Sequence, residues 1–115
     1  MNSVRRKASV RVHDRAAGFL VEFGPEQGGG YAFSYLPGYD GSPVSLTMPV
    51  REEPYRFDRF PPFFDGLLPE GWQLDALLRR AKLDRHDYMG QLLAVGQDVV
   101  GAVTVEPAPA EEMPS

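Results

Sequence analysis

The ten residues from Phe63 to Trp72 constrain the fold of this chain more than any other stretch. They combine two phenylalanines, two leucines, two glycines and a proline with the only tryptophan of the 115 residues, in the order FFDGLLPEGW. Before this stretch, apolar and polar side chains alternate, as in half-buried strands; after it, apolar residues recur every three or four positions, as in amphipathic helices. The stretch therefore predicts a corner between a sheet and a helical layer.

Three alternating runs precede this corner. They lie at residues 8–12, 19–23 and 31–35. Loops rich in glycine, proline and aspartate separate the runs, which favours an antiparallel meander. We further expect a short strand at 44–48, an irregular crossing segment at 50–62, and a last strand at 99–105 that returns to the sheet.

Two helices are predicted after the corner. The first runs from Glu70 to about Lys82, with the buried stripe Leu74, Leu77, Leu78 and Ala81. The second has Asp84 as its N-cap and ends at Gly96. Its apolar residues fill more than one stripe, so we expect it to be the more deeply buried helix. The predicted fold is α+β, an antiparallel sheet with two α-helices packed on one face.

Composition is that of one domain, at residues 8–106, with a flexible N-terminus at 1–7 and a disordered tail at 107–115. The net charge of −4 gives no electrostatic reason to expect direct nucleic-acid binding or an anionic membrane as partner. The chain has no cysteine, no secretory signal and no apolar run long enough for a bilayer. We therefore expect a cytoplasmic protein.

No residue pattern points to catalysis, a metal or a cofactor. The three glycines at 28–30 precede a strand, not the helix that a phosphate-binding loop requires. His13 and His86 form no metal-ligand motif, and no serine lies in a nucleophile elbow. Asp65 and Glu70 could act as an acid and a base, but a turn partner and a helix-start residue are the better interpretation. We expect no catalytic residue, no metal and no cofactor.

Trp72 is the one residue whose pattern suggests binding. At about 100° per residue it falls roughly 160° from Leu74, nearly opposite the apolar stripe. It shares its face with Asp75, Ala76 and Arg79. A Trp beside Ala and Arg on the polar side of a helix is typical of an interface anchor. A lone tryptophan is more often part of the core, and a small shift of the helix start would turn this side chain a long way. The sequence leaves both alternatives open.

Three blocks of residues together resemble the N-terminal subdomain of HipA-type serine/threonine kinase toxins. In that family the blocks run roughly S-L-x-L-P, F-F-x-x-L-L-P-E-G and L-x-x-x-G-x-D-x-x-G-A-V. Here they are Ser45–Val50, Phe63–Gly71 and Leu92–Val103, in the same order, within a resemblance that covers residues 8–106. In HipA the kinase body follows in the same chain. This chain contains no kinase catalytic loop, metal-binding aspartate motif or nucleotide-binding lysine.

Stand-alone chains of this kind look like HipS, the small antitoxin of tripartite HipBST toxin–antitoxin systems. The resemblance implies a protein that binds and neutralises a separate HipT-like kinase, in a ternary complex with a DNA-binding HipB-like protein. It also implies that a tryptophan makes the inhibitory contact near the kinase's nucleotide loop. The predicted partner-binding residues are Trp72, Ala76, Arg79, Asp65, Glu70 and Gly71.

An alternative of a different class stays open. The chain would be a structural subunit that completes a split HipA-like kinase and bridges it to the HipB-like partner, without inhibiting it. A small enzyme is a third and least favoured interpretation, because the sequence shows no polar site.

Overall fold

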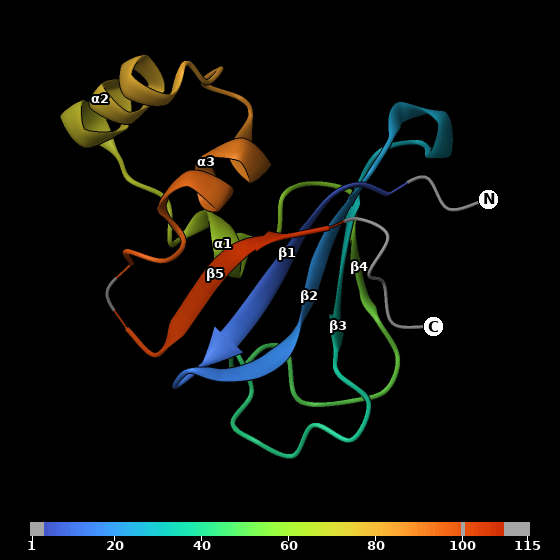
Figure 1. Cartoon of the computed structure of the whole chain (residues 1–115). Coiled ribbons are helices and arrows are strands. Elements are labelled where there is room, and N and C mark those ends of the chain that lie inside the picture. Colours follow the sequence, from blue (N-terminus) through green and yellow to red (C-terminus); the bar gives the residue numbers. More distant parts are fainter. Residues whose placement is uncertain (1–3, 100, 110–115) are drawn as a thin grey trace.

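The computed structural model describes residues 4–99 and 101–109 of the chain (Figure 1). Five antiparallel strands form one sheet in the order β4-β3-β2-β1-β5, and the α-helices lie to one side of it. The predicted α+β fold is confirmed. In chain order the elements are β1 (Val4–Val12), β2 (Arg15–Phe23), the 3-10 helix η1 (Pro25–Gln27), β3 (Tyr31–Tyr35), β4 (Tyr55–Phe57), α1 (Pro62–Asp65), α2 (Gly71–Ala81), α3 (Tyr88–Val95) and β5 (Val103–Ala108).

A two-residue turn closes the hairpin of β1 and β2. Val12 pairs with Arg15, and the turn residues His13 and Asp14 have φ angles of 51° and 65°. Positive φ at both central positions is the geometry of a type I′ turn, whose twist matches that of paired strands. His13 therefore belongs to the turn and not to β1.

The core lies between the sheet and the helices. Alternate side chains of β1 and β3 point toward the helices and are buried, as the alternating runs predict. In β2 the expected apolar face of Phe19, Val21 and Phe23 is turned away from the helices, and Leu20 enters the core instead. The ring centroids of Phe33 in β3 and Phe64 in α1 lie 5.9 Å apart. The core cluster includes Ala8, Val10, Leu20, Phe33, Phe64, Met89, Leu92 and Val105.

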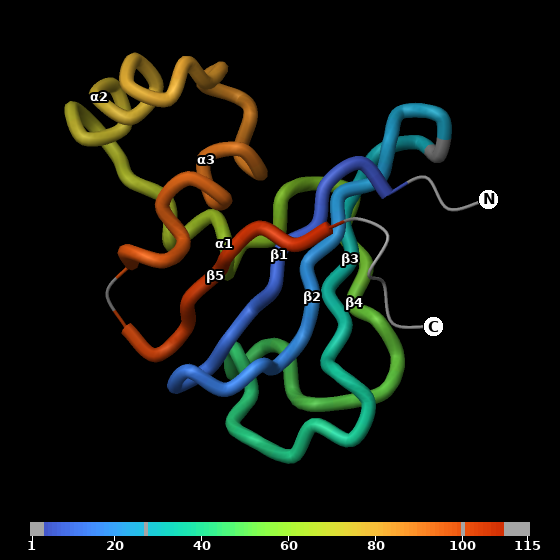
Figure 2. Tube along the Cα trace, viewed as in Figure 1, coloured from blue at the N-terminus to red at the C-terminus, as the bar shows by residue number. Residues whose placement is uncertain are grey.

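The two longer helices differ in how they meet this core. Four of the eight residues of α3 are buried, whereas Leu77 is the single buried residue of the eleven in α2. In Figures 1 and 2, α3 lies close to the sheet and α2 stands farther out. The prediction that the second helix is the more buried one is confirmed. Within the described residues, no helix is long and apolar enough to cross a membrane.

The first strand begins earlier in the chain, and the last strand ends later, than predicted. β1 begins at Val4, which pairs with Phe23 of β2, and Arg6 forms ion pairs with Glu22 at 2.6 Å and with Asp87 at 2.7 Å. Residues 4–7 are therefore strand and not a flexible end. β5 occupies Val103–Ala108 instead of 99–105, and pairs with β1 as far as Lys7. Residues 107 and 108 thus belong to the sheet and not to a disordered tail, while residues 1–3 and 110–115 lie outside the described part.

Three local predictions are also corrected. Residues 44–48 form a turn and not a strand, closed by an isolated bridge between Ser45 and Met48. The supposedly irregular segment 50–62 contains β4, which pairs with β3 at the sheet edge. The N-cap of α3 is Asp87, whose carboxylate accepts the Gly90 N–H at 3.0 Å. Asp84 instead accepts the His86 N–H within the preceding turn, at 2.7 Å.

Candidate partner-binding surface

The chain enters α2 through a sharp change of backbone direction at Glu70 and Gly71. Glu70 is extended, with φ −130° and ψ 166°, and its carbonyl accepts the Leu74 N–H at 3.4 Å. Gly71 has a φ of 59°, in the left-handed region. A Cβ at this position would meet no atom within 4 Å, so backbone conformation and not space favours glycine here. This corner sets the direction in which α2 leaves the domain.

Trp72 is exposed. Its relative exposure is 77%, whereas Leu77 on the opposite side of the helix is 2% exposed. Of the two alternatives that the sequence left open, the structure thus excludes the core position. An indole in water is unusual, because burying a large aromatic side chain is one of the stronger contributions to stability.

Ala76 and Arg79 follow Trp72 on the same side of α2. Arg79 is exposed and Ala76 is half-buried. We call these three residues the α2 outer face. Asp75, three residues after Trp72 and so near the same side, pairs with Arg85 at 2.6 Å, which ties the helix to the connection that leads to α3. Lys82, with a φ of 56°, closes the helix by donating its N–H to the Leu78 carbonyl. The helix is therefore defined at both ends although little of it is buried.

Asp65 and Glu70 belong to a different part of the surface. They lie in a hollow of about 300 Å³ between the corner and the start of α3. Trp72, Ala76 and Arg79 do not line it. The structure thus separates the six predicted residues into the α2 outer face and this corner hollow, with Gly71 at the junction. The lining residues are Asp65, Leu68, Pro69, Glu70, Leu74, Arg85, His86, Tyr88 and Gln91.

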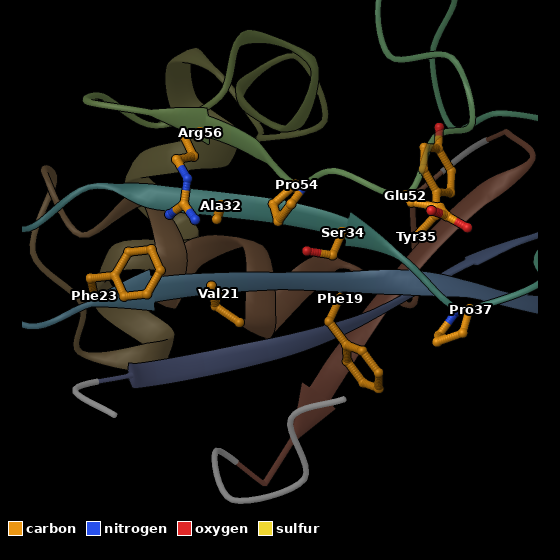
Figure 3. Close-up of a pocket in the computed structure, with 10 residues that line it drawn as sticks. All are labelled: Phe19, Val21, Phe23, Ala32, Ser34, Tyr35, Pro37, Glu52, Pro54 and Arg56. Atoms are coloured by element: carbon orange, nitrogen blue, oxygen red, sulfur yellow. The ribbon is translucent and has the colours of Figure 1, made fainter. Parts of the chain in front are cut away.

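A groove that the sequence did not predict lies on the outer face of the sheet, away from the helices (Figure 3). It has a volume of about 300 Å³ and a mostly apolar lining from β2 and β3, closed by residues before and within β4. Its signal was the run 19–23, in which Leu20 is as apolar as its neighbours, so that both faces of β2 are apolar. The groove is lined by Phe19, Val21, Phe23, Ala32, Ser34, Tyr35, Pro37, Glu52, Pro54 and Arg56.

The polar groups of Asp87 and Tyr35, whose pKa values are shifted, take part in hydrogen bonds that hold the fold together. The Arg6 guanidinium hydrogen-bonds Asp87 and holds the pKa of that carboxyl below its usual value. Burial raises the pKa of Tyr35, whose hydroxyl accepts the Val44 N–H at 3.0 Å. Gln91 is buried, and its amide donates to the carbonyl of Arg85 at 2.9 Å. Across the described ranges, no group of three or more His, Asp and Glu side chains could hold a metal ion.

Comparisons with known proteins place this architecture in a family. The family described as the HipA N-terminal domain matches residues 8–106. An uncharacterised protein of Haemophilus influenzae is 32% identical over 106 residues, which cover 92% of this chain and 96% of that protein. A solved structure described as the N-terminal domain of HipA toxin is similar with a TM-score of 0.71 and 30% identity, over 96% of this chain and 99% of that one. Since the family match covers residues 8–106, which include every α-helix and most of the sheet, this chain belongs to the HipA N-terminal domain family.

Proposed function

We propose that this chain is an antitoxin that binds a separately encoded HipT-like serine/threonine kinase and neutralises it. The observation that carries the proposal is the exposed Trp72 on a helix that stands away from the core. Membership of the HipA N-terminal domain family supports a role beside a kinase body. We further propose that the complex includes a DNA-binding HipB-like protein.

The α2 outer face suits a protein anchor on physical grounds. Trp is enriched among the residues that dominate binding energy, and such residues fill desolvated pockets. Arg79 adds a guanidinium that can pair with a carboxylate on the partner, and Ala76 leaves room for close approach between them. Inserting Trp72 into a pocket would be worth about 2–4 kcal/mol. By the usual conversion this corresponds to roughly 30-fold to 1,000-fold in affinity.

Inhibition would follow from where the anchor binds. Phosphoryl transfer depends mostly on positioning the nucleotide and its metal ions under a mobile loop. A tryptophan inserted beside that loop would hold it away from a productive geometry without any chemistry by this chain. The corner hollow, which carries Asp65 and Glu70 together with Arg85, would then lie at the edge of the same contact.

The test compares Trp72→Ala with Gln73→Ala. Gln73 is also exposed, follows Trp72 directly and lies about 100° around the helix, so it controls for any change in α2 itself. We expect Trp72→Ala to lose affinity for the cognate kinase by roughly 30-fold or more and to lose protection of cells that express it. Gln73→Ala should behave as the natural chain. Full protection by a folded Trp72→Ala variant would show that the tryptophan mechanism is wrong.

A kinase assay separates the antitoxin from the structural alternative. Purified kinase is assayed for autophosphorylation with and without this chain at saturating concentration. Inhibition supports the proposed function. Unchanged or increased activity, together with binding, would instead identify a subunit that completes the kinase.

A further inference from the structure

Leu46 is the most exposed large apolar residue in the part of the chain that the structure describes. Its relative exposure is 94%, against 77% for Trp72 and 39% for Val50. It sits at the tip of the turn that the bridge between Ser45 and Met48 closes. A leucine held almost entirely in water contributes little to the fold. Single exposed apolar side chains are common on protein surfaces, and what distinguishes Leu46 is the turn that holds it.

The turn that carries Leu46 is rigid. Val44 and Met48, on either side of the tip, are buried in the core cluster. The Tyr35 hydroxyl accepts the Val44 N–H at 3.0 Å and donates to the Met48 carbonyl, so one buried side chain fixes both arms of the turn. Within the turn, the Met48 N–H donates to the Ser45 carbonyl at 3.0 Å. Leu46 is thus presented in one place, which lowers the entropy lost when it is bound.

The surroundings of the tip favour a protein pocket over a lipid or a nucleic acid. Pro43 and Pro49 flank the turn, and Val50 follows it. The nearest basic residue along the chain, Arg51, lies over the Tyr55 ring at 3.7 Å and donates to the backbone carbonyls of Glu53 and Pro54. It is followed directly by the acidic Glu52 and Glu53. This mixed charge attracts no polyanion, and one leucine is too small a surface to hold a membrane.

The tip and the α2 outer face lie on the same side of the sheet. Val44 and Met48 join the cluster that also contains Phe64 and Met89, so the turn covers one end of the face that the helices cover. Figure 1 places α2 toward the other end. The molecule measures 40 × 34 × 23 Å, so a partner as large as a kinase, docked on this side, would reach both.

We propose that Leu46 is a second anchor for the partner kinase and enters an apolar pocket separate from the one that takes Trp72. The inference rests on the proposed function for the identity of the partner. Two rigidly held side chains at separate points would fix the orientation of the partner and also increase the affinity. A partner that covered only the α2 outer face would leave the most exposed apolar side chain in water.

The experiment measures the affinity of purified cognate kinase for a set of variants by calorimetry. The set comprises Leu46→Ser, Leu46→Met, Ser42→Ala, Trp72→Ala and the double variant Leu46→Ser with Trp72→Ala. Ser42 is an exposed control before the same turn, where only its carbonyl is used, as acceptor for Tyr39. Thermal unfolding of each variant checks the fold, and it should not change for Leu46→Ser because the side chain is already in water.

We expect Leu46→Ser to weaken binding about tenfold, and Leu46→Met and Ser42→Ala to bind as the natural chain. Because the two anchors lie far apart, the fold-losses of Leu46→Ser and Trp72→Ala should multiply in the double variant. Natural affinity for Leu46→Ser, with a loss for Trp72→Ala, would overturn this inference and leave the proposed function standing. So would a loss of self-association as the only effect of Leu46→Ser, which would assign the tip to a second copy of the chain. No binding by the natural chain would overturn both proposals.

Discussion

Helices α2 and α3 follow each other in the chain, but they have opposite relations to the sheet. α3 has buried residues along half its length, and its cap, Asp87, is bonded to Arg6 of β1. Its far end, Gly96, touches β5 so closely that an added Cβ would come within 2.4 Å of the Val105 carbonyl oxygen. α2 buries Leu77 alone and turns Trp72 to the solvent.

The difference shows that two neighbouring helices can have separate roles, one in stability and one in binding. A helix that completes the core has less free surface to offer a partner. A helix held by a corner, one ion pair and a short buried contact can present almost its whole length. Stability should therefore depend on α3 and binding on α2, and three measurements can break or sharpen this comparison.

The largest effect on stability is expected from Leu92→Ala in α3. Leu92 is fully buried in the core cluster that also contains Val105 of β5, so truncation leaves a cavity among close-packed neighbours. We expect a loss of about 2–5 kcal/mol in the free energy of unfolding, measured by urea denaturation. Leu78→Ala on α2, which removes the same atoms from a half-buried position, is the matched control and should cost clearly less. Equal losses would show that the two helices are equally part of the core.

The sequence predicted α2 more accurately than its surroundings. The expected limits of 70–82 became Gly71–Ala81, because Glu70 and Lys82 act as the two caps and the leucine spacing is a purely local signal. β4 was missed because three residues at a sheet edge carry almost no period, and their pairing with β3 is a tertiary contact.

The candidate site shows the same limit, because local sequence patterns do not reveal tertiary contacts. Helical geometry brings Trp72, Ala76 and Arg79 together, so the sequence could group them. Whether Asp65 and Glu70 join them depends on how the corner folds, and they line a separate hollow. The predicted strand at 44–48 was wrong for a related reason. Val44, Leu46 and Met48 alternate as in a strand, yet a turn buries the outer two and exposes the middle one.

A pH titration tests the link between α3 and the sheet. Arg6 lowers the pKa of Asp87 in the folded protein, so the contact stabilises the fold above the unfolded pKa of about 4 and is lost as the pH falls through the lowered value. We expect Asp87→Asn to cost about 1–2 kcal/mol at neutral pH, since Asn still caps the helix but removes the charge from two hydrogen bonds with Arg6. At pH 2 the variant and the natural chain should differ less. A constant difference across this pH range would show that the contact owes little to the charge.

The smallest effect on stability is expected from Trp72→Ala, and this result decides how the binding experiments are interpreted. At 77% exposure the indole contributes little to the core, and alanine has the higher helix propensity. The free energy of unfolding should therefore change by no more than about 0.5 kcal/mol. Because Trp72 is the only tryptophan, the measurement uses far-ultraviolet circular dichroism in urea and not intrinsic fluorescence.

Leu77→Ala, on the buried side of the same helix, is the control for this measurement. It should lose more stability than Trp72→Ala, which would confirm that the method detects changes in α2. A loss above about 1.5 kcal/mol for Trp72→Ala would mean that the tryptophan supports the fold, and weaker kinase binding would then reflect an altered α2 instead of a missing anchor.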